Sequence, residues 1–100
     1  VKLVPGNGTT DVDPSIRSIS VTFSMPMGGG MSWTGGGEQF PQIPSGERPK
    51  WSKDKLSCRL PVKLKSNHEY QLGLNSLSHN NFQSEAGIPL VPVVYKFTTQ

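Results

Sequence analysis

The 100-residue sequence has one cysteine, Cys58, so no disulfide can form within the chain. It has no run of about 18 apolar residues, the length that a membrane-spanning helix requires. No stretch shows the apolar periodicity of a helix. We therefore expect one all-β domain over residues 1–100, large enough to be stabilised by its core alone. Val1–Val4 contains neither an initiating Met nor a signal-peptide pattern, so we take the chain to be a module of a longer protein.

Residue patterns that carry catalysis or metal binding are incomplete. The segment from Gly30 to Gly35 contains a serine between two glycines, but it is one residue longer than the Gly-x-Ser-x-Gly motif of a hydrolase nucleophile elbow. The two histidines and Cys58 are too few for a structural zinc site, which uses four Cys or His ligands. Asp11 and Asp13 are too few for Ca²⁺, which takes about six or more oxygen ligands, and a turn-forming role fits them better. We expect no enzymatic activity, no cofactor and no metal site.

Strict alternation of apolar and polar residues over positions 56–64 is the strongest structural signal. A period of two places the apolar set on one face of a half-buried strand. The alternation returns over positions 70–74, after the polar, turn-prone stretch 65–69. We predict two core strands joined by a tight corner, with Cys58 as a small buried hydrophobe. The inward positions are Leu56, Cys58, Leu60, Val62, Leu64, Tyr70, Leu72 and Leu74.

Shorter apolar segments, rich in β-branched and aromatic residues, predict the strands that cover these two. Residues 25–50 and 75–92 are rich in glycine, proline, serine and asparagine and are predicted to be loops, interrupted by one short strand. In that strand Trp33 would enter the core, as a tryptophan does in immunoglobulin-like sandwiches. The additional strands are Val1–Val4, Ile16–Phe23, Met31–Thr34 and Val93–Phe97, with a hairpin between Trp51 and Leu56.

The corner at 65–69 has a spacing found in two-sheet β-proteins. Leu64 is followed six residues later by Tyr70, which resembles the tyrosine corner of Greek-key sandwiches. In that motif the tyrosine hydroxyl bonds to a backbone group a few residues upstream. Asn67 occupies the turn, and asparagine tolerates the left-handed backbone conformation. We predict that Tyr70 is buried and pins this corner.

Both ends of the chain carry motifs of one family. The first end shows Pro5, Gly8, Val12, Phe23-Ser24 and Pro26-Met27, and the last shows Glu85-Ala86-Gly87 and Phe97-Thr98-Thr99. With these residues the sequence resembles the bacterial immunoglobulin-like domain of the S-layer-associated type. The resemblance implies a Greek-key sandwich of about seven strands in an extracellular or cell-envelope protein. It also implies a non-catalytic module, whose partners are neighbouring domains of the same chain or another surface protein.

Positive charge is concentrated in less than one fifth of the chain. Seven of the ten Lys and Arg residues lie between positions 48 and 65, with only Asp54 against them. The outward phase of the strand starting at Leu56 carries a row of Lys55, Arg59, Lys63 and Lys65. We interpret the row as a solvated face whose lysines oppose edge-to-edge aggregation. The alternative is a ridge for an anionic partner; nucleic acid is disfavoured because no aromatic residues alternate with the charges.

Two functional hypotheses remain. The first is a structural or interaction module. The second is a carbohydrate-binding module, with a glycan as partner, in which aromatic rings around the glycine-rich stretch 28–37 form flat platforms. We expect Trp33 to be in the core and Trp51 or Phe82 to be more exposed. The aromatic residues considered for this ligand surface are Trp33, Phe40, Trp51 and Phe82.

Overall fold

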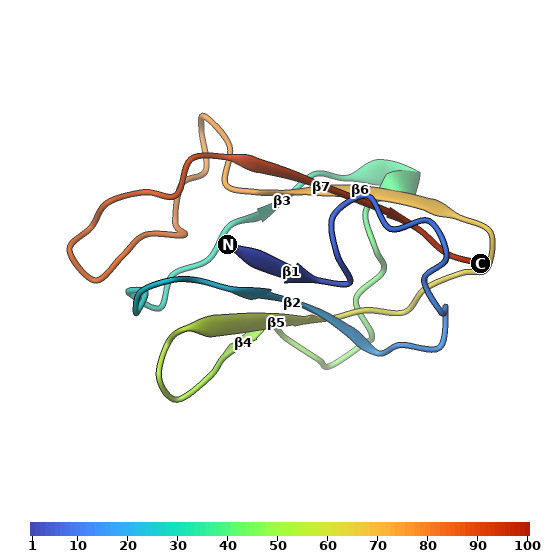
Figure 1. Ribbon diagram of the computed structural model, residues 1–100, viewed down its shortest axis with the longest axis horizontal. Coiled ribbons are helices and arrows are strands. Elements are labelled where there is room, and N and C mark those ends of the chain that lie inside the picture. Colours follow the sequence, from blue (N-terminus) through green and yellow to red (C-terminus); the bar gives the residue numbers. More distant parts are fainter.

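Two antiparallel sheets face each other in the computed structural model, which describes all residues 1–100 (Figure 1). The four-stranded sheet has the order β1-β2-β5-β4, and the three-stranded sheet has the order β3-β6-β7. The predicted all-β class, with about seven strands and no disulfide, is confirmed. The only helical element is a single 3₁₀ turn, η1 (Gly37–Gln39). The strands are β1 (Lys2–Val4), β2 (Ser18–Thr22), β3 (Trp33–Thr34), β4 (Lys50–Trp51), β5 (Ser57–Pro61), β6 (Glu69–Leu74) and β7 (Val93–Thr98).

The core lies between the sheets and is built from the alternating positions. In the four-stranded sheet Val21 pairs with Cys58, and in the other sheet Leu72 pairs with Tyr95. Because side chains alternate across a strand, each pair of partners points to the same side, which here is the inside. Cys58 is fully buried, as its phase predicted. The buried apolar residues are Val12, Ile19, Val21, Phe23, Met27, Cys58, Leu60, Val62, Tyr70, Leu72, Leu74, Phe82, Tyr95 and Phe97.

The predicted strands are present, but several are shorter than their sequence patterns. The strand expected over positions 56–64 is regular only over β5, and single hydrogen bonds follow it. The Val62 N–H still donates to the Arg17 carbonyl oxygen at 2.9 Å, next to β2, and the Lys63 N–H donates to the Gln42 carbonyl oxygen at 2.7 Å on the other side of the strand. Pro61 has no N–H for the ladder, which favours the end of the regular strand here. The hairpin predicted between Trp51 and Leu56 is confirmed, with Trp51 opposite Cys58 and Lys55 at φ 59° in the turn.

The N-terminal segment passes from one sheet to the other. β1 pairs with β2, but residues 8–12 run beside β7. The Gly8 N–H donates to the Lys96 carbonyl oxygen at 2.7 Å, and the Val12 N–H donates to the Thr98 carbonyl oxygen at 3.0 Å. This segment therefore covers backbone groups that would otherwise lie open on an edge strand.

The long loop 75–92 is organised by one buried side chain. Asn75 is 2 % exposed and has a left-handed φ of 64°. Its amide nitrogen donates to the carbonyl oxygens of Phe82 (3.0 Å) and Leu90 (2.9 Å), and its amide oxygen accepts from the Phe82 N–H at 2.9 Å. The side chain thus satisfies backbone groups that no strand pairs, and it holds Phe82 in the core.

We predict that Asn75→Ala destabilises the domain by about 3 kcal/mol, because the Phe82 N–H and the Leu90 carbonyl oxygen lose their hydrogen-bond partner and the Phe82 carbonyl oxygen keeps only the Leu90 N–H. Chemical denaturation followed by tryptophan fluorescence measures the change. Asn75→Gly is the matched variant: it also removes the amide but accepts the positive φ, so it should lose less stability than Asn75→Ala. An unfolding midpoint that is unchanged in both variants would contradict the role assigned to Asn75.

Candidate functional site

Tyr70 pins the corner between β5 and β6. It is 4 % exposed, and its hydroxyl oxygen accepts a hydrogen bond from the Lys65 N–H at 2.8 Å. Asn67 has the left-handed φ of 50° that the turn needs, and the half-buried Leu64 packs against the core. The Tyr70 ring stacks on Phe97 at a centroid distance of 5.2 Å. These contacts give the three corner residues a structural role.

The predicted ligand surface does not form one exposed platform. Phe82 is fully buried, so the expectation that it could be more exposed than Trp33 is wrong. Its ring lies 5.4 Å from that of Trp33 and 5.9 Å from that of Trp51, both edge-on, and Phe23 completes the cluster. Trp33 and Trp51 are half-buried and pack against the core. Phe40 lies apart from this cluster, beside His68 and Tyr70.

The glycine-rich stretch packs against another loop of the same chain. The Gly28 N–H donates to the Gln83 carbonyl oxygen at 2.9 Å, and the Trp51 Nε1–H donates to the Gly29 carbonyl oxygen at 2.8 Å. A Cβ on Gly30 would lie 2.8 Å from the Asn81 carbonyl oxygen, which real Cβ atoms do not tolerate. The close approach that these glycines allow is therefore used for internal packing.

Cys58 is fully buried in the core, and burial keeps its thiol protonated. Desolvation raises the pKa of the Cys58 thiol to about 11, with a smaller opposite effect from the indole N–H of Trp33. Because the thiolate is the reactive form, this cysteine is inert at neutral pH. The indole nitrogen of Trp33 is itself buried and has no oxygen or nitrogen acceptor, so the Cys58 sulfur is the polar group that it faces.

Of the two aspartates considered for a cation, Asp13 acts in a turn. Asp13 Oδ1 accepts from the Ser15 N–H at 2.9 Å and from the Ser15 hydroxyl at 2.7 Å, and these bonds lower the pKa of Asp13. Asp54 accepts in the same way from the Ser52 hydroxyl and the Leu56 N–H, which lowers its pKa. No three His, Cys, Asp or Glu side chains come together anywhere in the structure.

The four residues of the predicted basic row are all exposed, but they do not stay together. Lys55 lies in the β4–β5 turn, and Arg59 lies on the outer side of β5 opposite Lys50. Lys63 and Lys65 line a small pocket with Phe40 and His68. These last two lysines follow the end of β5 at Pro61, and this separates them from Arg59.

An apolar pocket at one end of the sandwich was missed from the sequence. It has a volume of about 280 Å³ and lies between loops 24–27 and 84–91, at the left of Figure 1. Its rim side chains are unusually exposed: Met25 is 52 %, Ile88 67 % and Val91 80 % exposed. Phe23 and Met27 also line it, and so does Val1. We call this feature the end pocket. The sequence feature that could have indicated this pocket is the high apolar content of residues 25–27 and 88–91, which lie in predicted loops.

Comparisons with protein-family models, curated proteins and solved structures find no match to this chain. No helix in the structure has the length and apolar character needed to cross a membrane.

We predict that Tyr70→Phe lowers the free energy of unfolding by about 1–2 kcal/mol, because the Lys65 N–H loses its acceptor while ring packing is retained. Thermal or urea unfolding measures the loss. Tyr95→Phe is a useful comparison, since the Tyr95 hydroxyl donates to the Pro5 carbonyl oxygen at the point where the N-terminal segment changes sheets. Wild-type stability in Tyr70→Phe would show that the corner does not depend on this bond.

Proposed function

We propose that the chain is a non-catalytic, immunoglobulin-like module with a structural or interaction role in a bacterial secreted or cell-surface multidomain protein. The observation that carries this proposal is the strand order. In seven-stranded immunoglobulin-like domains one sheet combines the first, second, fifth and fourth strands, and the other combines the third, sixth and seventh. The orders β1-β2-β5-β4 and β3-β6-β7 agree with that arrangement.

Two further observations support the same assignment. The hydroxyl of Tyr70 bonds to the backbone five residues upstream, as in the tyrosine corner of Greek-key sandwiches. The bacterial, extracellular setting rests on the resemblance of the motifs at both ends of the chain, including Pro26-Met27 and Glu85-Ala86-Gly87. Since a fold of this kind serves many functions, the role must come from its surfaces.

The end pocket is the surface through which the module would meet a neighbouring domain of the same protein. Exposed apolar patches on small domains mark interaction sites. Val1 lines the pocket, so a domain joined ahead of Val1 would leave from its rim. The C-terminus lies at the end of the molecule opposite this pocket, along a longest dimension of about 40 Å, and the N-terminus lies nearer the middle (Figure 1). Domains joined at the two termini would therefore be held apart along the long axis.

Hydrogen exchange tests this assignment. We predict that backbone amides of residues 84–91 exchange about tenfold more slowly in the natural full-length protein than in the 100-residue chain, because the neighbouring domain covers them. Val91→Asp in the full-length protein should remove this protection. Val94→Asp is the matched control, since Val94 is 58 % exposed but does not line the end pocket. Equal exchange in the full-length protein and the isolated chain would contradict the docking.

The aromatic carbohydrate platform is not part of this proposal, because Phe82 is buried and the Trp51 indole N–H is already bonded to Gly29. We predict that a panel of neutral glycans leaves the tryptophan emission of the chain unchanged. The control is Trp51→Phe, which retains a ring against Phe82 but removes the emission of Trp51. A saturable shift in the wild type that disappears in Trp51→Phe would restore the carbohydrate hypothesis.

A further inference from the structure

The outer side of the four-stranded sheet carries cations and no carboxylate. The pairing register places Lys50 on β4 directly opposite Arg59 on β5, and Arg59 in turn opposite Ser20 on β2. Lys2 on β1 pairs with Thr22 and adds a third cation on the same side. We call this surface the outer face. Its strand residues are Lys2, Val4, Ser18, Ser20, Thr22, Lys50, Ser57 and Arg59, together with the buried Pro61 opposite Ser18.

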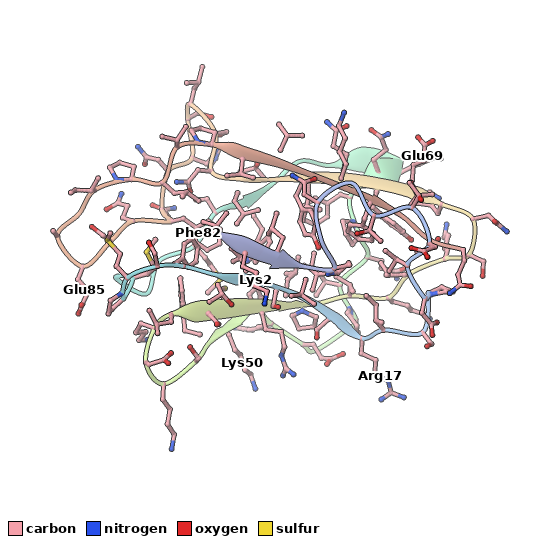
Figure 2. The ribbon with its side chains drawn as sticks, viewed as in Figure 1. Lys2, Arg17, Lys50, Glu69, Phe82 and Glu85 are labelled. Carbon is pink, nitrogen blue, oxygen red and sulfur yellow. The ribbon has the colours of Figure 1, made fainter.

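The opposition of Lys50 and Arg59 is unfavourable for the folded chain alone. Like charges directly opposite each other on neighbouring strands repel and destabilise the sheet. No strand residue of the outer face is Asp or Glu, so nothing on the sheet neutralises them. In Figure 2 Lys50 and Arg17 point away from the other sheet, while the labelled Glu69 and Glu85 lie on that other sheet and at the far left end. The outer face is thus a region of positive potential.

Short hydroxyl side chains lie between these cations. Ser18, Ser20, Thr22 and Ser57 form a hydroxyl strip along β2 and β5, and the Thr22 and Ser57 hydroxyl oxygens are 3.0 Å apart. Each hydroxyl can both donate and accept a hydrogen bond. Because these side chains are small, the strip is a low, flat surface with Lys2 toward one edge and Lys50 toward the other.

We propose that the outer face binds an acidic polysaccharide, a linear glycan that carries sulfate or carboxylate groups. The anionic groups pair with Lys50, Arg59 and Lys2 in charge-assisted hydrogen bonds. The sugar hydroxyls bond to the hydroxyl strip. A bound anion also relieves the repulsion between Lys50 and Arg59, which destabilises the free protein, and this relief favours binding.

The composition of the outer face favours a polysaccharide over nucleic acid. Proteins that hold single strands stack the bases on aromatic side chains. Trp51, the aromatic residue on β4, pairs with the buried Cys58 and therefore lies on the inner side of the sheet. The outer face has no helix to enter the major groove of a duplex. Hydroxyl groups and cations without aromatic rings match the groups of a charged sugar chain.

Titration calorimetry with dextran sulfate tests the proposal, and dextran serves as the neutral polymer with the same backbone. Experiments run at about 0.1 M salt, where distant surface charges are largely screened. We expect the 100-residue chain to bind dextran sulfate and not dextran.

Arg59→Glu should weaken binding by about tenfold or more, since each cation near an anionic array contributes roughly a factor of five. The same variant places a carboxylate opposite Lys50, so its unfolding temperature should be unchanged or higher.

Lys63→Glu is the matched control, because it makes the same change in net charge beyond the end of β5, at the pocket near His68 and not opposite Lys50. It should retain most of the binding. Equal losses in Arg59→Glu and Lys63→Glu would show attraction by net charge only and would overturn the proposal. Absence of dextran sulfate binding would overturn it as well. Tighter binding of a single-stranded or duplex DNA oligonucleotide than of dextran sulfate would reassign the outer face to polyphosphates.

Discussion

The ring of Phe82 joins the two sheets at one end of the core. It packs on Trp33 from the three-stranded sheet and on Trp51 from the four-stranded sheet, with Phe23 beside it. Asn75 fixes its backbone on both the N–H and the carbonyl side. Aromatic pairs of this kind contribute about 0.5–1.5 kcal/mol beyond the burial of their surface. In a domain without a disulfide, the cohesion of the sheets at this end depends on one loop residue and the amide that holds it.

The position of Phe82 also determines the end pocket. With residues 82–84 drawn against the glycine-rich stretch, the remainder of the loop projects beyond the sandwich, and Ile88 and Val91 stay in solvent. The loop therefore has an anchored part, which belongs to the core, and a projecting part, whose apolar side chains Ile88 and Val91 are exposed. An exposed apolar surface of this kind lowers the solubility of a protein unless another protein covers it.

The outer face and the end pocket differ in chemistry because different constraints form them. The outer face follows from strand pairing, which aligns Lys50 and Arg59 although eight residues separate them in the chain. The end pocket follows from loop packing. A module with a polar, cationic sheet face and an apolar end can contact a charged polymer and a neighbouring domain at the same time, since the two surfaces do not share a residue.

The sequence by itself determined which residues enter the core strands, because a period of two is a local property of the chain and needs no partner to be recognised. It also indicated the Tyr70 corner, whose hydrogen bond spans only five residues. Tertiary structure alone decided where Phe82 points, because its burial depends on Asn75 and on two tryptophans far away in the chain. It likewise separated Lys63 and Lys65 from Arg59 and brought Lys2 and Lys50 onto one face. The outer face and the end pocket, to which we assign binding, both form through contacts between distant segments of the chain, and no local sequence pattern encodes such contacts.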